Sequence, residues 1–233
     1  MQFFVGTSGY SYPKWKGSFY PEKLPQSQML SYYAERFGAV EINNTFYKMP
    51  SASDVKSWAS QVPPDFRFAI KAPQTITHFK RLKDAVEPTK QLFRMASALK
   101  ARVGPILFGL PPNFKKDLPR LRTFLKLVPR NRQVAFEFRH ESWFDEEVFD
   151  CLRQRRCALC IADAEELPRS KLVATTNFGY VRLRRKNYTR KSLVDWIKKM
   201  RAMPWNEAYV FFKHEDTGTG PKFAGRFLER AHG

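Results

Sequence analysis

The sequence has few cysteines and no long hydrophobic run. Its three cysteines, Cys151, Cys157 and Cys160, are odd in number, and no second pair completes a zinc site with Cys157 and Cys160. We therefore expect buried, unreactive thiols. No apolar stretch approaches the ~20 residues of a membrane span, and the first residues do not resemble a secretory signal. These absences predict a cytoplasmic protein with no membrane partner.

Three catalytic or cofactor motifs are also missing. The first turn reads Gly6-Thr7-Ser8-Gly9-Tyr10, which is not the G-x-G-x-x-G of a dinucleotide-binding fold. No G-x-S-x-G elbow and no H-E-x-x-H helix occurs. The sequence therefore gives no support for a nicotinamide enzyme, a serine hydrolase of the Ser-His-Asp type or a zinc protease.

Acidic residues are scarce relative to basic ones. Lysine and arginine number 41 against 22 aspartates and glutamates, which gives a formal net charge of +19. This balance favours polyanionic partners such as nucleic acid, an acidic membrane surface or a phosphorylated substrate. The basic residues are spread along the chain and form no dense tail. Charge alone therefore keeps nucleic acid among the candidate partners without selecting it.

Strand-like and helix-like patterns alternate along the whole chain. The expected strands are Phe3–Ser8, Ala39–Asn43, Arg67–Pro73, Pro105–Pro111, Gln133–Arg139, Ala158–Asp163, Gly179–Arg184 and Glu207–His214. The expected helices are Ser27–Phe37, Ser51–Ser60, Glu87–Ala101, Asp117–Leu127, Asp145–Arg155, Thr189–Met203 and Pro221–Arg230. The segment Ala164–Asn177 shows no clear long helix.

Eight alternations in 233 residues predict a single (β/α)8 TIM-type barrel, lean and irregular around its sixth helix. A doubly wound open sheet is the alternative, but it usually has fewer strands and would carry the missing glycine motif. No linker, repeat or low-complexity tract divides the chain. We therefore expect one domain over residues 1–233.

The stretch from Val134 to Phe144 organises the rest of the chain. It begins as a buried strand in which Glu137 and Arg139 share one face, while the intervening phenylalanines share the other. Ionised groups are costly to bury unless they are paired or used. These charges come at the C-terminal end of the strand, where an α/β barrel builds its active site.

Ionisable residues recur at the other strand ends. A ring of structural salt bridges is one interpretation, although apolar residues would stabilise a pure scaffold as well. Three of the four histidines fall at this end of the barrel, which favours a functional site. The residues expected at the mouth are Thr7, Ser8, Glu41, Asn43, Lys71, His78, Gly109, Glu137, Arg139, His140, Asp163, Arg182, Arg184, Lys213 and His214.

The mixed charge favours carboxylate acid/base chemistry on an anionic substrate. Neighbouring charges are expected to separate the pKa values of the carboxyl groups, leaving one basic and one acidic. The candidate catalytic residues are Glu137, Glu41, His140, His78 and Asp163, and Lys71, Arg139, Arg182, Lys213 and Asn43 are expected to bind substrate. The side-chain types also suit a divalent metal, but the four cations oppose one, so no metal ligand is assigned.

Two loops are expected to complete the site. Aromatic residues crowd the loop after the first strand and could stack on a sugar or base, or form a plug over the rim; the candidates for substrate contact are Tyr10, Trp15, Tyr47 and Trp143. After the eighth strand, Gly218 and Gly220 precede a helix, and with Arg184 they suit a phosphate site.

Several motifs, in order along the chain, resemble the YecE-like family, domain of unknown function 72. They include Gly6–Tyr12, Val40–Tyr47, Glu137–Trp143 and Phe212–Asp216. The resemblance implies a TIM-type barrel of bacterial or archaeal cytoplasmic proteins and supplies no established reaction. Many relatives carry Gln where this chain has Gly109.

These observations favour an enzyme acting on a small anionic compound, phosphorylated or nucleotide-like, at the mouth of the barrel. They do not distinguish a hydrolase from an isomerase or lyase, and they leave the cofactor unknown, with a divalent metal disfavoured. The alternative is a nucleic-acid-binding protein, in one form a metal-dependent nuclease, that uses the basic surface. A third interpretation is an interaction scaffold with a vestigial site.

Overall fold

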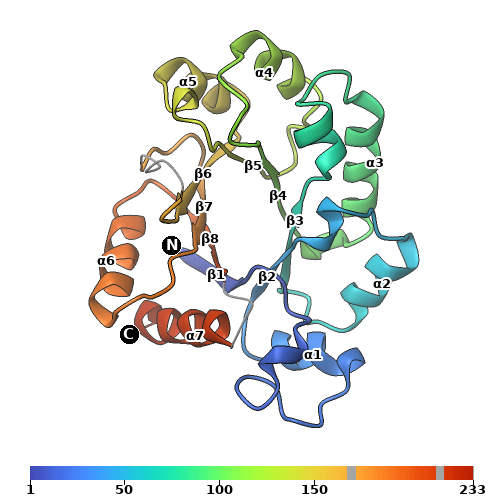
Figure 1. The fold of residues 1–233 in the computed structure, drawn as a ribbon, viewed down its shortest axis with the longest axis vertical. Helices are drawn as coiled ribbons and strands as arrows, with labels where there is room; N and C mark the ends of the chain where they lie inside the picture. Colours follow the sequence, from blue (N-terminus) through green and yellow to red (C-terminus); the bar gives the residue numbers. More distant parts are fainter. Residues whose placement is uncertain (167–171, 214–217, 233) are drawn as a thin grey trace.

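A computed structural model describes residues 1–166, 172–213 and 218–232. Eight parallel strands form one sheet that curls into a nearly closed barrel (Figure 1), in the order β1-β8-β7-β6-β5-β4-β3-β2. The strands are β1 (Gln2–Thr7), β2 (Ala39–Ile42), β3 (Arg67–Lys71), β4 (Val103–Gly109), β5 (Val134–Glu137), β6 (Ala158–Asp163), β7 (Phe178–Leu183) and β8 (Glu207–Phe212). The predicted TIM-type barrel is confirmed.

Helices surround the barrel and follow the predicted ranges closely. They are α1 (Met29–Ala34), α2 (Ala52–Ser60), α3 (Val86–Ser97), α4 (Leu118–Leu125), α5 (Glu146–Gln154), α6 (Arg190–Arg201) and α7 (Thr219–His232). The expected capping box at Ser51 and Asp54 is present. In the described residues between β6 and β7, 164–166 and 172–177, no helix forms.

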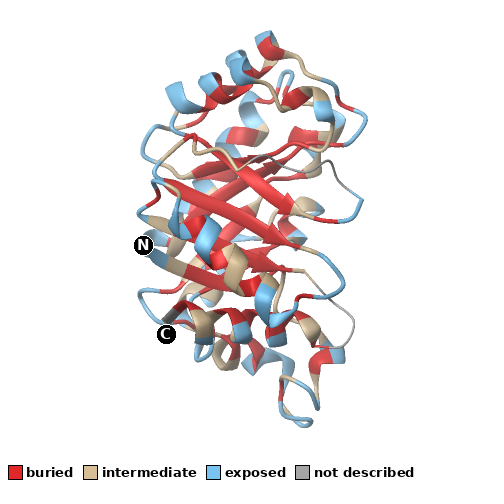
Figure 2. Ribbon diagram, turned by 90° about the vertical axis from the view of Figure 1, so that its left-hand side faces the viewer, coloured by how far each residue is buried: buried red, intermediate tan, exposed pale blue. Residues whose placement is uncertain are grey.

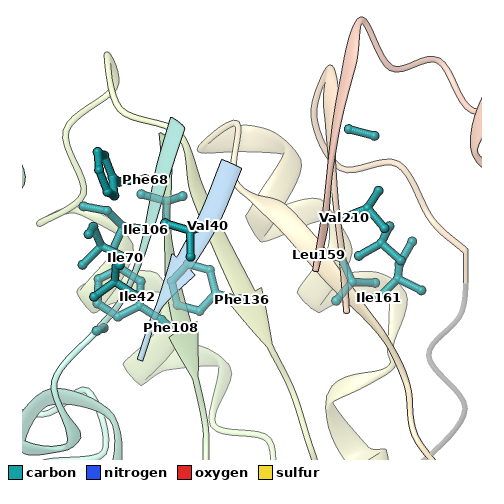
Figure 3. Packing of buried hydrophobic residues seen from close by; sticks show 14 of the residues in the cluster. Val40, Ile42, Phe68, Ile70, Ile106, Phe108, Phe136, Leu159, Ile161 and Val210 are labelled. Carbon is teal, nitrogen blue, oxygen red and sulfur yellow. The ribbon is translucent and has the colours of Figure 1, made fainter. Parts of the chain in front are cut away.

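Each strand is buried on both faces, as Figure 2 shows. The outward side chains pack beneath the helices in a large hydrophobic cluster, part of which appears in Figure 3. A smaller cluster fills the interior of the barrel, with Phe4, Tyr209 and Phe211 among its members. Inward and outward side chains alternate along every strand. Whether a residue lies an even or an odd number of positions from an inward residue, here called its parity, therefore decides whether its side chain faces the mouth.

The barrel closes between β1 and β2 through few backbone contacts. Ser8 and Glu41 form a single bridge, and the hydroxyl of Tyr33 spans the rest of the seam. This hydroxyl accepts a hydrogen bond from Thr7 N at 2.7 Å and donates one to Ala39 O at 3.0 Å. Gly6 permits this approach, because a Cβ there would lie 1.8 Å from Ala39 O. The Tyr33 side chain of α1 thus supplies hydrogen bonds to both strands where β1 and β2 do not pair directly.

The three cysteines are free and buried, as predicted. Burial raises the pKa of Cys157 to about 12, so its thiol stays protonated and unreactive at neutral pH.

Replacing Tyr33 by Phe is expected to lower the free energy of unfolding by about 1–3 kcal/mol, because a buried amide and carbonyl would lose their partner. Chemical denaturation measures the change. Tyr32→Phe is the matched control on the same helix, since Tyr32 is only half-buried and should tolerate the loss of its hydroxyl. Equal effects of the two substitutions would contradict the role of Tyr33 in closing the barrel.

Candidate functional site

Two wholly buried carboxylates lie at the C-terminal ends of two strands that are not neighbours in the sheet. Glu41 on β2 and Glu137 on β5 each have 0% exposure. Each follows, two residues later, an alanine of the barrel interior, Ala39 and Ala135. The alternation of a strand therefore directs both carboxylates into the mouth of the barrel. Their outward neighbours Val40 and Phe136 pack on the other face (Figure 3).

Arg182 of β7 joins the two carboxylates. Its Nη1 donates a hydrogen bond to Glu137 Oε1 at 2.8 Å, and its Nη2 donates one to Glu41 Oε1 at 2.9 Å. Its residue exposure is 2%. Both guanidinium ends are thus occupied by charged acceptors, the arrangement that a buried arginine needs.

Neutral donors complete the shell around Glu41. Tyr180, two residues before Arg182, donates to Glu41 Oε2 at 2.7 Å, and Ser8 donates to Oε1 at 2.8 Å. Sequence reasoning missed Tyr180 because its partner lies on a distant strand. The signal that could have found it is its position two residues from Arg182, on the same inward face.

Glu137 is bound by two more arginines. Arg139 Nη2 donates to Glu137 Oε2 at 2.8 Å, and Arg184 Nη1 lies 3.7 Å from Oε1. Side-chain exposures of 19% for Arg139 and 13% for Arg184 place these two guanidinium groups between the buried carboxylate and solvent. Gly109 leaves room for the Glu137 carboxylate, because a Cβ there would lie 3.1 Å from Glu137 Oε2.

Both carboxyl groups are held in the ionised state. Burial is the largest single effect and opposes this. The charge of Arg182 with the hydrogen bonds of Tyr180 and Ser8 outweighs it and lowers the pKa of Glu41, and Arg182, Arg139 and Arg184 together hold the pKa of Glu137 well below its usual range. The expectation of one basic and one acidic carboxyl group is therefore wrong. The two carboxylates share Arg182, and each has further donors of its own, so neither one forces the other to keep a proton.

Lys71, the last residue of β3, has a pKa that is lowered toward neutrality. Burial and then the charge of Arg182 lower its pKa to about 8, against the attraction of Glu41 and Glu137. Its Nζ lies 4.3 Å from the centroid of the Phe46 ring.

His78 lies on the rim beside the same ring. Burial and the charges of Arg139 and Lys71 lower its pKa, so its imidazole is neutral at physiological pH. Its ring packs edge-on against Phe46 at 4.9 Å, and its Nδ1 is 2.9 Å from the hydroxyl of Thr77. His78 therefore joins the mouth as a neutral group.

Asp163 does not join this network, which corrects one prediction. Its carboxylate accepts hydrogen bonds from Arg185 at 2.6 Å and Tyr188 at 3.0 Å. On β6 the interior residues are Ala158 and Cys160, so Asp163, an odd number of residues further, points to the opposite face. It stabilises the connection between β7 and α6.

His140 has a local structural role. Its backbone begins a short helical turn, and its Nδ1 accepts a hydrogen bond from Ser142 N at 3.2 Å. Residue 140 lies three residues beyond the end of β5, and among the described residues it forms no hydrogen bond or ion pair with the two buried carboxylates. Its catalytic role stays a prediction.

Two of the predicted aromatic contacts are wrong. Trp15 and Trp143 are 1% and 0% exposed, so neither presents a face to a bound molecule. Trp143 stacks on the outward Phe138 at 4.7 Å and donates to Phe114 O, while Trp15 packs in the aromatic cluster of the β1–α1 loop. The plug interpretation of that loop fits Trp15.

Other predicted residues lie around the rim. Tyr10 and Asn43 line a hollow of about 210 Å³ with Tyr12 and Trp58, and among the described residues Asn43 Oδ1 has no hydrogen-bond partner. Tyr47 is 76% exposed. These positions are compatible with substrate contact, which stays a prediction.

The loop after β8 is only partly described. Lys213 directly follows β8, two residues after the inward-facing Phe211, and so has the same parity. His214 lies outside the described residues. Gly218 has a positive φ of 71° and packs against Ser18, where a Cβ would meet Oγ at 2.3 Å. Gly220 lies inside α7. Their phosphate-binding role is untested.

Within residues 1–166, 172–213 and 218–232, no three side chains of His, Cys, Asp or Glu cluster as a metal site would require. Those residues also contain no helix long and apolar enough to cross a membrane.

The family model described as "Protein of unknown function DUF72" matches residues 4–233. The chain belongs to the DUF72 family. The resemblance inferred from its motifs is thereby confirmed. A DUF72 family protein of Thermotoga maritima is 28% identical, with full coverage of both chains and a TM-score of 0.86. One from Enterococcus faecalis is 17% identical, covers 99% of this chain and 96% of its own, and has a TM-score of 0.81.

Named relatives of this DUF72 chain are longer than it is. The UPF0759 protein YecE of Escherichia coli is 32% identical over 142 residues, or 60% of this chain and 50% of YecE. The UPF0759 protein YunF of Bacillus subtilis is 28% identical over 144 residues, or 57% and 50%. The chain thus spans about half the length of the curated relatives it matches.

The substitution Arg182→Met is expected to lower the free energy of unfolding by about 3–5 kcal/mol, because it leaves two buried carboxylates without their shared cation. Arg184→Met is the matched control, since Arg184 is 3.7 Å from Glu137 and partly exposed; it should cost far less. Chemical denaturation compares them. A loss below about 1 kcal/mol for Arg182→Met would contradict its bridging role.

Proposed function

We propose that this DUF72 chain is an enzyme that acts on a small anionic compound at the C-terminal mouth of its barrel. The proposal is supported by where the charges lie, since barrels of this type build active sites from the ends of several strands. Here β2, β3, β5 and β7 each contribute an ionisable side chain, Glu41, Lys71, Glu137 and Arg182, to one cluster.

The excess of positive charge in this cluster is the observation that carries the proposal. Four cations, Lys71, Arg139, Arg182 and Arg184, surround the two buried carboxylates. Arg184 also lies 3.8 Å from the exposed carboxylate of Glu166, so the cluster keeps an excess of one positive charge. A buried excess of this kind is costly unless an anion offsets it. Arg139 and Arg184, on the solvent side of Glu137, are the groups best placed to bind the anion.

An unsatisfied donor supports the same assignment. Among the described residues, Arg184 Nε is buried and has no hydrogen-bond partner. A phosphate or carboxylate accepts several guanidinium hydrogen bonds at once and would supply one. We therefore favour a phosphorylated or carboxylated compound, with a nucleotide as one form.

The roles of the carboxylates differ from simple acid/base catalysis. Glu41 and Glu137 are ionised at neutral pH and cannot donate protons, because their pKa values lie below the ordinary range. In the proposed enzyme they hold the arginines in place for the substrate. Proton exchange near neutral pH falls to Lys71, whose pKa is about 8, with neutral His78 as a further acceptor.

The double substitution Arg139→Gln with Arg184→Gln should weaken binding of inorganic phosphate, measured by calorimetry, by about tenfold or more, because two charge-assisted contacts are lost. Lys198→Gln with Lys199→Gln, an exposed pair on α6, is the control of equal charge change and should bind phosphate as the parent does. Equal losses in the two variants would show that phosphate responds only to overall charge.

A second candidate function, binding of single-stranded nucleic acid, is favoured by two exposed aromatic residues. Tyr47 and Phe79 are 76% and 70% exposed and lie on consecutive loops after β2 and β3, each next to an exposed lysine, Lys48 and Lys80. Bases stack on exposed aromatic side chains beside a basic surface, without sequence preference. In this function the phosphate backbone of the nucleic acid would run from the mouth of the barrel onto this rim.

Fluorescence anisotropy with a single-stranded oligonucleotide across a salt series tests this second function. Tyr47→Ala with Phe79→Ala should weaken binding by about tenfold or more if bases stack there, and the parent affinity should fall steeply with salt. Val86→Ala, which trims another exposed apolar side chain, is the control. Unchanged affinity of the aromatic variant would eliminate the rim as a nucleic-acid site.

A further inference from the structure

Lys71 differs from the other cations of the mouth in having no anionic partner of its own. The carboxylates of Glu41 and Glu137 are occupied by arginine, tyrosine and serine donors. Among the described residues, no carboxylate oxygen lies within 4.0 Å of Lys71 Nζ, and its recorded close contact is the face of the Phe46 ring.

The placement of Lys71 keeps its amine available for reaction. It ends β3 with the same parity as Ala69, which belongs to the barrel interior, so it points into the mouth, where it is only half-buried. An ammonium without ion pairs in a partly desolvated site loses its proton easily. The resulting amine is a nucleophile at the point where a barrel exposes its substrate.

The charged groups that act on this amine come from several elements. Arg182 and Arg139 disfavour the protonated form of Lys71, whereas Glu41 and Glu137 favour that form. The charge of Lys71 in turn lowers the pKa of His78, which lies after β3. Burial is the largest effect on this amine, and together with the two arginines it lowers the pKa of Lys71 to about 8.

We propose that Lys71 is a nucleophile that forms an imine with the carbonyl group of an anionic aldehyde or ketone. This inference rests on the proposed function and narrows its substrate class to an oxo compound carrying a phosphate or carboxylate. Arg139 and Arg184 hold the anionic group, and the carbonyl carbon faces Lys71. The ring of Phe46 shields one side of the amine from water.

The proposed step needs no oxidant, reductant or metal. The lone pair of neutral Nζ forms a bond to the carbonyl carbon, and the carbonyl π electrons move to oxygen, which takes up a proton to give a carbinolamine. The nitrogen lone pair then expels this hydroxyl group, which leaves as water after taking a second proton. One of the two protons comes from Nζ itself and one from solvent, so the product is a protonated imine.

Pyridoxal 5′-phosphate, an aldehyde with a phosphate group, is a suitable probe for the whole chain. The protein is incubated with the probe, reduced with borohydride and digested, and the labelled lysine is located by mass spectrometry. We expect one equivalent of label at Lys71. At about pH 8 its labelling should be roughly 100-fold faster than that of a surface lysine, because an amine of pKa near 10.5 is then almost wholly protonated.

Two variants and one control make the experiment specific. Lys71→Met should lose the label, and it should fold, because the substitution removes a poorly stabilised buried charge. Lys71→Arg keeps the charge and should also lose the label, since a guanidinium is not a nucleophile at this pH. Lys198→Met, on the exposed surface of α6, should be labelled at Lys71 as the parent is.

The outcomes distinguish a failure of the imine proposal from a failure of the proposed anion-binding function. Labelling at Lys71 with a pH midpoint near 8, and competition by phosphate, would support both. Binding of the probe that Arg139→Gln with Arg184→Gln abolishes, but without a reducible adduct at Lys71, would overturn the imine and leave the anion site standing. Label scattered over surface lysines, with no saturable binding, would overturn both.

Discussion

The buried bridge from Glu41 through Arg182 to Glu137 is the interaction on which the mouth of this barrel depends. It joins β2, β7 and β5, strands that are far apart in the sequence and have no shared backbone ladder. Charges at such depth are tolerated only when every one is paired. The bridge therefore fixes the positions of these strand ends, and it thereby fixes the positions of the residues that flank them.

Such a bridge is a poor way to stabilise a scaffold. Apolar residues of similar volume often serve a protein interior as well as or better than buried ion pairs, and the layer below the bridge is built in that way, from Phe4, Tyr209 and Phe211. The change from an apolar to a charged layer occurs at the strand ends where barrels place their chemistry. The position of the charges therefore supports a function at the mouth.

The sequence predicted the barrel because strand and helix periods alternate clearly and both faces of each strand are apolar. It also placed Glu137 and Arg139 on one face, since residues two apart on a strand share a face, and the structure pairs them. It placed Asp163 at the mouth, although this residue lies an odd number of positions from the inward residues of β6 and therefore faces outward. It took Trp15 and Trp143 as rim residues because burial depends on packing between loops that no local pattern records.

The ionisation of the site could not be predicted in the same way. The pKa of Glu41 depends on Arg182 and Tyr180, which lie far along the chain on another strand, and the three-dimensional pairing assigns each carboxylate its own donors. Lys71 illustrates the reverse case, because burial and the charge of Arg182 lower its pKa against the attraction of Glu41 and Glu137. Side-chain types at strand ends indicated a site, but the charge states come from the tertiary contacts.

Carbon-13 NMR of the glutamate side-chain carboxyl groups across a pH titration tests the central claim most directly. The signals of Glu41 and Glu137 are assigned by their absence in Glu41→Gln and Glu137→Gln. We predict that both carboxyl groups stay ionised as the pH falls below 4.5, the ordinary value for glutamate, and that they take up protons only as the fold loses stability. Either signal titrating at or above 4.5 in the folded protein would contradict the bridge.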